Sequence, residues 1–288
     1  MNELHMKAYA KINLGLAVTG RLPNGYHQVK MIMQTIGIWD ELTLRKTESG
    51  ITITTDSGLL PTDRNNLVYR AAELMAAKYN ISSGFHIHIE KNIPIAAGMA
   101  GGSTDAAAVM KGISILCGLD APLSQLMEYS VSIGADVPYC LLGGTALAQG
   151  IGEELTPLPP LPDCHILVAK PDCMVSTKSV YEQLDALSFH HPDIDGMAEA
   201  INGGKLSGVI RRMENVLETV TIPAHPVIKE LKDKMLALGA AASLMSGSGP
   251  TVFGIFPPDQ TQEARTAFQE FQKDTRARQT FLVRPINH

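Results

Sequence analysis

The stretch that decides the fold reads Pro94-Ile95-Ala96-Ala97-Gly98-Met99-Ala100-Gly101-Gly102-Ser103-Thr104-Asp105. Before it, residues 85–90 alternate between apolar and polar side chains, which predicts a β-strand. After it, the apolar run 106–116 predicts a helix, with the polar residues 103–105 as candidate N-caps. A glycine turn between a strand and a helix start is typical of an anion site, because glycine lets backbone N–H groups approach a ligand closely.

The glycine turn lacks the two commonest nucleotide-binding motifs. No Gly-Lys-Ser/Thr follows it, so it is not a Walker A loop. Gly98-x-x-Gly101 lacks the leading G-x-G of the dinucleotide fingerprint, and no strand ends with an acidic residue at the required distance. On the glycines alone, an anion site and a turn without a ligand therefore both remain open.

The composition is that of a globular protein without a nucleic-acid footprint. The chain has 288 residues, of which 45% are hydrophobic and 18% charged, enough for a full core in one large domain or two ordinary ones. Its formal net charge of -5 provides no basic surface for nucleic acid. We therefore expect no nucleic-acid partner, and any site for an anionic substrate has to be built locally.

The cysteines and the hydropathy pattern predict a cytoplasmic location. No C-x-x-C pair and no zinc spacing occurs among the four cysteines, which are Cys117, Cys140, Cys164 and Cys173. The first residues lack the apolar core of a signal peptide, and no uncharged apolar run reaches the roughly 18 residues of a membrane span. We expect reduced thiols and no membrane partner, and no feature of the sequence indicates an oligomeric state.

Residues 7–18 predict a first strand with an unusual polar face. Its apolar side chains alternate with Tyr9, Lys11 and Asn13. A solvated strand face would explain a lysine next to an asparagine, and a functional site would explain it as well.

Several further elements are expected in the first half of the chain. The turn Pro23-Asn24-Gly25 delivers Tyr26 and His27 to the next extended stretch. Asp136 follows a helix end, in a loop over residues 134–138. The elements expected here are strands at 26–44 and 51–55 and helices at 66–79 and 123–133.

The second half predicts a ferredoxin-like domain. Four prolines between residues 155 and 162 indicate a linker, which divides the chain into residues 1–160 and 161–288. Beyond it the expected order is β-α-β-β-α-β with extra helices in the first crossover. These elements are strands at 165–169, 242–245, 251–256 and 280–284, and helices between 177 and 238 and at 261–271.

Two charged residues are candidates for phosphoryl transfer, which needs positioning, charge neutralisation and an acceptor hydroxyl held in line. Lys11 and Asp136 each lie at the edge of an otherwise apolar element. Taken alone, Lys11 is as readily a surface lysine and Asp136 a turn residue. We interpret His86-x-His88 as strand surface and residues 190–193 as a polar loop, because neither comes with a full set of metal ligands.

Together these segments resemble the GHMP kinase superfamily of small-molecule kinases. The match spans nearly the whole chain and rests on Ala-Tyr-Ala-Lys-Ile-Asn-Leu at 8–14, Gly-Tyr-His at 25–27, the glycine turn at 94–105, Ser-Ile-Gly-Ala-Asp-Val-Pro at 132–138 and Met-Ser-Gly-Ser-Gly-Pro-Thr at 245–251. Met99 and Ala100 stand where the superfamily loop usually has Leu and Gly. The resemblance implies an α+β fold of two domains, with an N-terminal domain like ribosomal protein S5 and a C-terminal ferredoxin-like domain.

The resemblance also implies a reaction. It is ATP-dependent phosphorylation of a cytidine diphosphate-linked polyol, a step of the non-mevalonate route to isoprenoid precursors. In such enzymes the residue matching Asp136 is the general base, the residue matching Lys11 orients it, and residues 94–104 hold the ATP phosphates. Mg²⁺ is expected with ATP, and Ser103 or Thr104 could serve as a ligand. The residues expected to bind the acceptor substrate are Asn13, Tyr26, His27, Thr177, Tyr181, Gly247 and Ser248.

Two other functions remain open. Another kinase of the superfamily would act on mevalonate, homoserine or a sugar, but Tyr26 and Tyr181 suit a flat base better because they offer aromatic faces. A non-catalytic binding module based on an S5-like domain would need a basic surface for nucleic acid, which a net charge of -5 does not provide.

Overall fold

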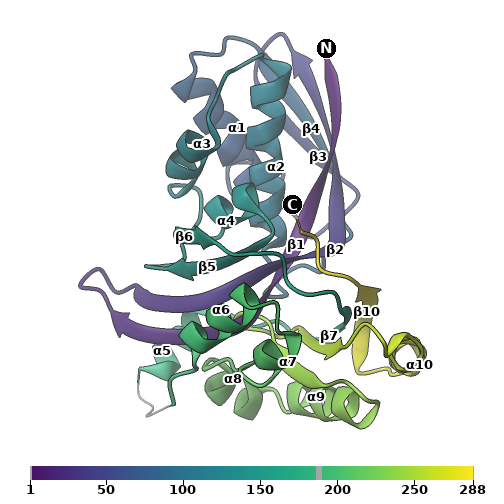
Figure 1. The fold of residues 1–288 in the computed structure, drawn as a ribbon. Helices are drawn as coiled ribbons and strands as arrows, with labels where there is room; N and C mark the ends of the chain where they lie inside the picture. The colour runs from purple at the N-terminus through teal and green to yellow at the C-terminus, as the bar shows by residue number, and fades with distance from the viewer. Residues whose placement is uncertain (1, 186–189, 288) are drawn as a thin grey trace. The chain divides into compact units, whose positions relative to one another are not determined.

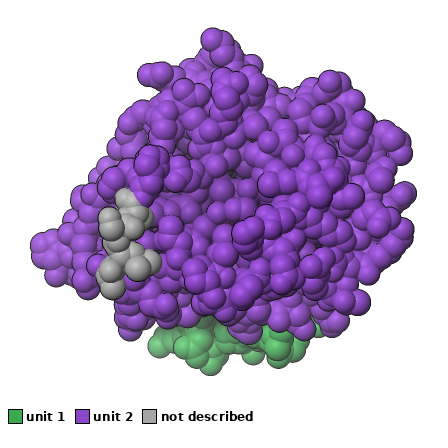
Figure 2. Space-filling view, turned by 90° about the horizontal axis from the view of Figure 1, so that it is seen from below, with its two compact units in different colours: residues 1–10, 38–93, 100–142 green, residues 11–37, 94–99, 143–288 purple. Residues whose placement is uncertain are grey.

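The chain folds into two compact units, and each unit draws on several parts of the sequence. The computed structural model describes residues 2–185 and 190–287 (Figure 1). Unit 1 comprises residues 1–10, 38–93 and 100–142, and unit 2 comprises residues 11–37, 94–99 and 143–288 (Figure 2). The division at residues 160 and 161 concerns sequence domains and stays a prediction, because the chain passes between the compact units several times.

Two long strands run through both units. They are β1 (Glu3–Arg21) and β2 (His27–Thr47), which pair with each other. In unit 1, the end of β2 pairs antiparallel with β4 (Gly84–Glu90), and β3 (Ile51–Thr55) runs parallel to β4. The strands predicted at 51–55 and 85–90 are therefore confirmed.

Four helices complete unit 1: α1 (Leu67–Lys78), α2 (Gly101–Leu116), α3 (Leu123–Ser130) and α4 (Val137–Leu142). The Asn66 side chain caps α1 by accepting the N–H of Val68. Helices α1 and α2 pack together, and their buried faces share one apolar core with strand residues such as Leu44 and Phe85. This core supports α2, the helix that follows the glycine turn.

Several predicted boundaries in unit 1 are wrong, among them the end of the helix predicted at 123–133, since α3 ends at Ser130. Helix α2 begins at Gly101 rather than near residue 106, with Ala100 in the left-handed conformation at its N-cap and no side-chain cap. The polar side chains expected to cap it make tertiary contacts instead, since Thr104 donates to the Tyr9 carbonyl and Asp105 pairs with Lys91. Residues 134–138 are only partly a loop, because α4 already begins at Val137.

Unit 2 contains two strands that the sequence analysis missed, and both belong to the same six-stranded sheet as β2. Strand β5 (Thr145–Gln149) pairs antiparallel with residues 31–34 of β2 and with β6 (Glu154–Pro157). The predicted linker at 155–162 therefore begins inside a strand. Its prolines hid β6, yet proline is tolerated at a sheet edge, where its missing N–H removes no ladder bond.

The second sheet of unit 2 has the predicted ferredoxin-like order. Its four strands are arranged β10 (Ala277–Val283), β7 (His165–Pro171), β9 (Val252–Phe256) and β8 (Ala242–Met245), and neighbouring strands are antiparallel. In chain order this is the sequence 4-1-3-2. Helices α9 (Val227–Ala237) and α10 (Thr261–Gln272) pack on the sheet, which confirms the β-α-β-β-α-β prediction.

The first crossover carries the remaining helices, which are α5 (Thr177–Leu184), α6 (Ile194–Asn202), α7 (Leu206–Ile210) and α8 (Glu218–Ala224) (Figure 1). Within residues 2–185 and 190–287, no helix is both long and apolar enough to cross a membrane. The four cysteines carry free thiols.

Candidate functional site

The first half of the glycine turn, residues 94–99, is held within unit 2 by hydrogen bonds to two carbonyls. The Lys11 N–H donates to the Met99 carbonyl over 3.2 Å, and the Lys11 ammonium lies 3.4 Å from the Gly98 carbonyl. The Ser246 hydroxyl also donates to the Gly98 carbonyl, over 2.9 Å. Gly98 has φ +72°, and a Cβ there would overlap the Ser246 carbonyl. The turn therefore requires glycine at this position.

Residues 94–99 meet a second glycine-containing turn, residues 246–250, inside unit 2. Ser246, which opens the second turn, bonds to Gly98 in the first. A Cβ on Gly247 would lie 3.3 Å from the Gly98 carbonyl and 3.5 Å from the Asn13 amide oxygen. Residues 94–99 belong to the same compact unit as this second turn.

Lys11 and Asn13 are buried, so the solvated-face interpretation of their strand is wrong. Lys11 is 5% exposed and Asn13 is fully buried. The Lys11 ammonium donates to the Asn13 amide oxygen over 2.8 Å. A buried lysine is costly unless its donors are satisfied, and here carbonyl and amide oxygens of the site accept from it.

Asn215 is a site residue that the sequence analysis missed. It is 2% exposed, and its amide nitrogen donates to the carbonyls of Met245 and Gly247, each over 2.8 Å. Glu218 adds a carboxylate oxygen that accepts the Met245 N–H over 2.8 Å. These two residues set the position of the second glycine turn. No motif in the sequence singles out Asn215, because its partners are backbone groups thirty residues away.

The residues predicted for the acceptor substrate form two groups in unit 2. In the first, the hydroxyls of Thr177 and Ser248 are 2.8 Å apart, beside Gly247 and Asn13. In the second group, the ring of His27 stacks on Tyr181 with centroids 4.9 Å apart and planes 25° apart.

The imidazole of His27 also pairs with a carboxylate. Its Nε2 lies 2.7 Å from a carboxylate oxygen of Asp185, whose second oxygen pairs with Arg21 over 2.9 Å. The hydrogen bond from His27, reinforced by Arg21, holds the pKa of the Asp185 carboxyl below its usual value. The side chain of Tyr26, next to His27, is 59% exposed.

The second half of the glycine turn begins helix α2 in unit 1. Ala100 has φ 57°, and Gly101 and Gly102 form the first residues of the helix. A Cβ on Gly102 would meet only a Leu67 methyl carbon, at 3.7 Å. The first-turn N–H groups of a helix have no intrahelical partners and face outward as anion donors. The space at Gly102 leaves these donors accessible to a ligand.

Asp136 lies at the start of α4. Its carbonyl accepts the Cys140 N–H over 3.0 Å, the first hydrogen bond of that helix. The side chain is half-buried. A turn residue and a catalytic carboxylate are both compatible with this position.

The histidines at 86, 88 and 190 make polar contacts at the protein surface. The Thr54 hydroxyl lies 3.3 Å from His86 and 2.9 Å from His88, on the strands β3 and β4. His190 pairs with Glu214 over 3.2 Å. Among the residues that the structure describes, no group of three or more His, Cys, Asp or Glu side chains could hold a metal ion.

Two family models match the chain. The model of the GHMP kinases N terminal domain matches residues 66–144, and that of the GHMP kinases C terminal domain matches residues 186–274. The chain belongs to the GHMP kinase family. This confirms the resemblance inferred from the five sequence segments, and the fold of this GHMP kinase agrees with it.

Curated relatives of this GHMP kinase carry one name. Proteins called 4-diphosphocytidyl-2-C-methyl-D-erythritol kinase are 53% identical in Lachnospira eligens, covering 98% of both chains, and 52% identical in Lachnoclostridium phytofermentans, covering 99% of this chain and 98% of the relative. The similarity therefore includes both halves of the sequence.

Solved structures agree with the fold. A crystal structure of 4-(cytidine 5'-diphospho)-2C-methyl-D-erythritol kinase has a TM-score of 0.82 and 32% identity, covering 99% of this GHMP kinase and 100% of that chain. Homoserine kinase from Cytophaga hutchinsonii has a TM-score of 0.79 but only 20% identity, covering 100% and 95%. At that identity the likeness shows the fold alone.

Proposed function

We propose that this chain phosphorylates the 2-hydroxyl of 4-diphosphocytidyl-2-C-methyl-D-erythritol with ATP, a step of non-mevalonate isoprenoid biosynthesis. The observation that carries the kinase chemistry is the junction of the two glycine turns at Gly98, beside the buried Lys11. The full-length similarity to kinases of that name supports this acceptor. A cytoplasmic location is part of the proposal and is supported by the four free thiols.

In this proposal residues 94–104 hold the phosphates of ATP. The α2 N-terminus supplies outward N–H groups and partial positive charge. Gly98 is required by packing, because a Cβ there would overlap the Ser246 carbonyl. Gly102 has room for a Cβ within the protein, and in this proposal the phosphates occupy that room.

Lys11 and Asp136 are proposed to activate the acceptor hydroxyl. Asp136 would take its proton as general base, and Lys11 would orient the hydroxyl and neutralise developing charge. Burial of Lys11 supports its role, because a desolvated ammonium interacts more strongly with a reacting oxygen than a solvated one does. Asp136 is only half-buried, which is compatible with contact between this residue and a substrate.

The cytidine end of the acceptor is proposed to lie against the aromatic residues. Tyr26 and Tyr181 offer ring faces, and His27 offers a ring nitrogen for the base edge. The stack of His27 on Tyr181 supports this assignment, because it places two planar rings next to each other. Asn13, Thr177, Gly247 and Ser248 are proposed to hold the polyol.

Mg²⁺ is proposed to enter as the ATP complex. It is usually held by one or two protein groups together with substrate phosphates, rather than by an all-protein cage. The absence of a metal-ligand cluster in the described part of the chain fits this mode. Thr104 already donates its hydroxyl to the Tyr9 carbonyl, so Ser103 is the better candidate for a hydroxyl ligand.

One experiment separates the proposed acceptor from the alternatives. ATP consumption by the purified protein is measured with the cytidine diphosphate-linked polyol, mevalonate, homoserine, a sugar, or no acceptor. We expect consumption to depend on the cytidine compound. Consumption with another acceptor would indicate a different kinase of the family, and no consumption with any of them would favour a binding module.

A further inference from the structure

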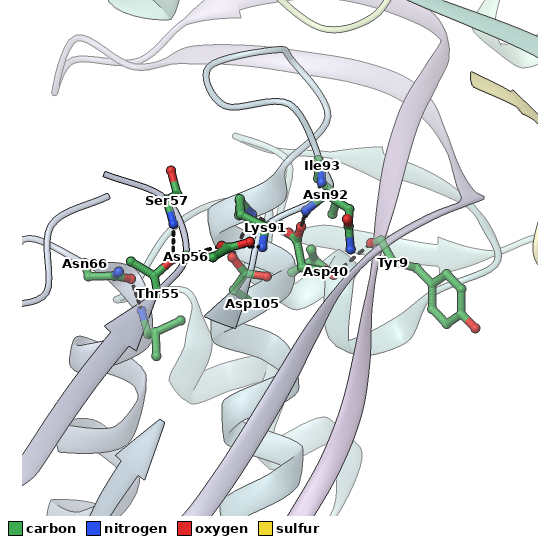
Figure 3. A network of polar contacts seen from close by, with 12 residues as sticks. Tyr9, Asp40, Thr55, Asp56, Ser57, Asn66, Lys91, Asn92, Ile93 and Asp105 are labelled. Atoms are coloured by element: carbon green, nitrogen blue, oxygen red, sulfur yellow. Dashed lines mark hydrogen bonds and ion pairs between the residues drawn. The ribbon is translucent and has the colours of Figure 1, made fainter. Parts of the chain in front are cut away.

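A buried charge network in unit 1 takes no part in the proposed reaction. It joins Asp40 of β2, Lys91 just after β4, and Asp105 of α2, whose side chains are 0%, 5% and 2% exposed. The Lys91 ammonium contacts one oxygen of Asp40 and one of Asp105, the latter over 2.8 Å (Figure 3). Three ionisable groups in one apolar core need a physical explanation.

The network holds the residues that enter the glycine turn. The second oxygen of Asp40 accepts the N–H groups of Asn92 over 2.6 Å and Ile93 over 2.8 Å, as Figure 3 shows. Ile93 immediately precedes Pro94, the first residue of the turn. Asp40 therefore fixes the backbone at the point where the turn begins.

The same network reaches the residues that leave the turn. The Lys91 ammonium lies 3.0 Å from where a Cβ on Gly101 would stand, and Asp105 is one helical turn further along α2. Gly101 is thus packed on the ammonium that also contacts Asp40. Lys91 therefore contacts Asp40, which holds the residues before the turn, and also packs against Gly101, which follows the turn.

Stability alone does not account for this arrangement. Buried ion pairs lose much of their attraction to desolvation, and apolar replacements of similar volume are often as stable or more so. One oxygen of Asp105 also has no hydrogen-bond partner among the described residues, although it is buried. A network with such a cost is better explained by the geometry that it imposes.

We propose that Asp40, Lys91 and Asp105 are positioning residues that set the separation of residues 93 and 101, and thereby the shape of the phosphate-holding turn. The inference rests on the proposed ATP site. In this proposal the three side chains act through the backbone that they hold rather than on the substrate itself. They act by fixing both ends of the turn from within unit 1.

The test compares a network variant with a matched control. Lys91→Met/Asp105→Asn removes the ammonium and replaces the carboxyl by an amide of the same shape, which can donate to Asp40. Lys234→Met is the control, because Lys234 pairs with the little-exposed Asp274 and contacts no residue flanking the turn. Both are assayed by melting temperature, by KM for each substrate, and by amide hydrogen exchange over residues 92–102.

We expect the network variant to raise the ATP KM by roughly 10-fold or more. Misplacing a binding group by about 1 Å through a distant mutation can reduce catalysis by about 10²-fold. The acceptor KM should stay unchanged, and exchange over 92–102 should accelerate. The milder Asp105→Asn keeps the Lys91–Asp40 contact, so its ATP KM should rise less, by roughly two- to tenfold on the scale of one hydrogen bond. If the double variant does not fold, Asp105→Asn alone tests the proposal.

Unchanged hydrogen exchange at 92–102 in the network variants would overturn the proposal, whatever the activity. An equal rise of both KM values, or an equal rise of ATP KM in the control, would do so as well. Failure of the wild-type protein to consume ATP would instead refute the proposed function, and the exchange measurement still tests the positioning role.

Discussion

Gly102 is the residue of the glycine turn at which a methyl group has room in the protein. The nearest atom to its Cβ position is a Leu67 methyl carbon at 3.7 Å, and its backbone is helical. Alanine should therefore fit, and in a helix it is even favoured over glycine by about 0.5–1 kcal/mol. Any loss of ATP binding in Gly102→Ala then reports the ligand rather than the fold.

We predict that Gly102→Ala keeps or raises the melting temperature while raising the ATP KM roughly 10–150-fold. This range corresponds to one hydrogen bond to a charged group, about 1.5–3 kcal/mol. Calorimetric titration with ATP and a melting curve measure both. Gly58→Ala, where a Cβ would meet nothing within 4 Å, is the control and should change neither. An unaltered ATP affinity would remove residues 101 and 102 from the phosphate site.

Asp105 makes the stability of unit 1 depend on pH. Burial, aided by the charge of Asp40 and opposed by Lys91, raises the pKa of Asp105 from 3.8 to about 8. The folded protein then holds this proton more tightly than the unfolded chain does. The resulting contribution to stability is fully present below about pH 4 and is lost as pH rises towards 8.

Asp105→Asn should remove this dependence. Between pH 5 and 8 the free energy of unfolding of the wild-type protein should fall relative to that of the variant, by up to about 1.4 kcal/mol per pH unit for one proton. Urea titrations of both proteins at several pH values give the difference. Parallel pH profiles would show that Asp105 does not titrate in this range.

At the scale of elements, the second glycine turn depends on the side chain of Asn215, which lies in the connection between α7 and α8. Asn215 satisfies two buried carbonyls of the turn, and its amide oxygen accepts the Leu217 N–H over 3.0 Å. The backbone next to Asn215 also bonds to β1, through Leu16 and Val216. This residue therefore ties the turn to the strand that carries Lys11.

We predict that Asn215→Ala lowers the free energy of unfolding by about 1–3 kcal/mol, because it leaves buried carbonyls without donors. It should also raise the ATP KM, since Ser246 and Gly98 lose their fixed geometry. Asn287→Ala is a suitable comparison, because Asn287 donates to a single carbonyl, that of Leu161. If Asn215→Ala weakened stability without affecting ATP, the turn would be a structural element only.

At the scale of the whole molecule, the proposed reaction relies on two charged residues that lie far apart in the sequence. Lys11 lies in β1, and Asp136 immediately precedes α4. Loss of a general base typically lowers the rate by about 10²–10⁴-fold. We predict losses of this size for both Asp136→Asn and Lys11→Ala, with the double variant losing far less than the product of the two. Single-turnover rates test this, and fully multiplicative losses would mean that the two residues have separate tasks.

The sequence by itself determined the family, the order of elements and most of the candidate residues. Period-two alternation and glycine turns are local patterns, so the strands at 51–55, 85–90 and 242–245 and the ferredoxin-like order could be predicted from them. The glycine turn and the Lys11 strand were recognisable because their residue types lie close together along the chain.

Only the tertiary structure decided which polar side chains are buried and what they hold. Lys11 and Asn13 alternate like a solvated face but are covered by other elements, and the expected caps of α2 bond elsewhere. Asn215 and the network of Asp40, Lys91 and Asp105 could not be recognised in the sequence, because their partners lie 14 to 51 residues apart or are backbone groups. A sequence pattern reports local periodicity, whereas these contacts depend on which distant segments the fold brings together.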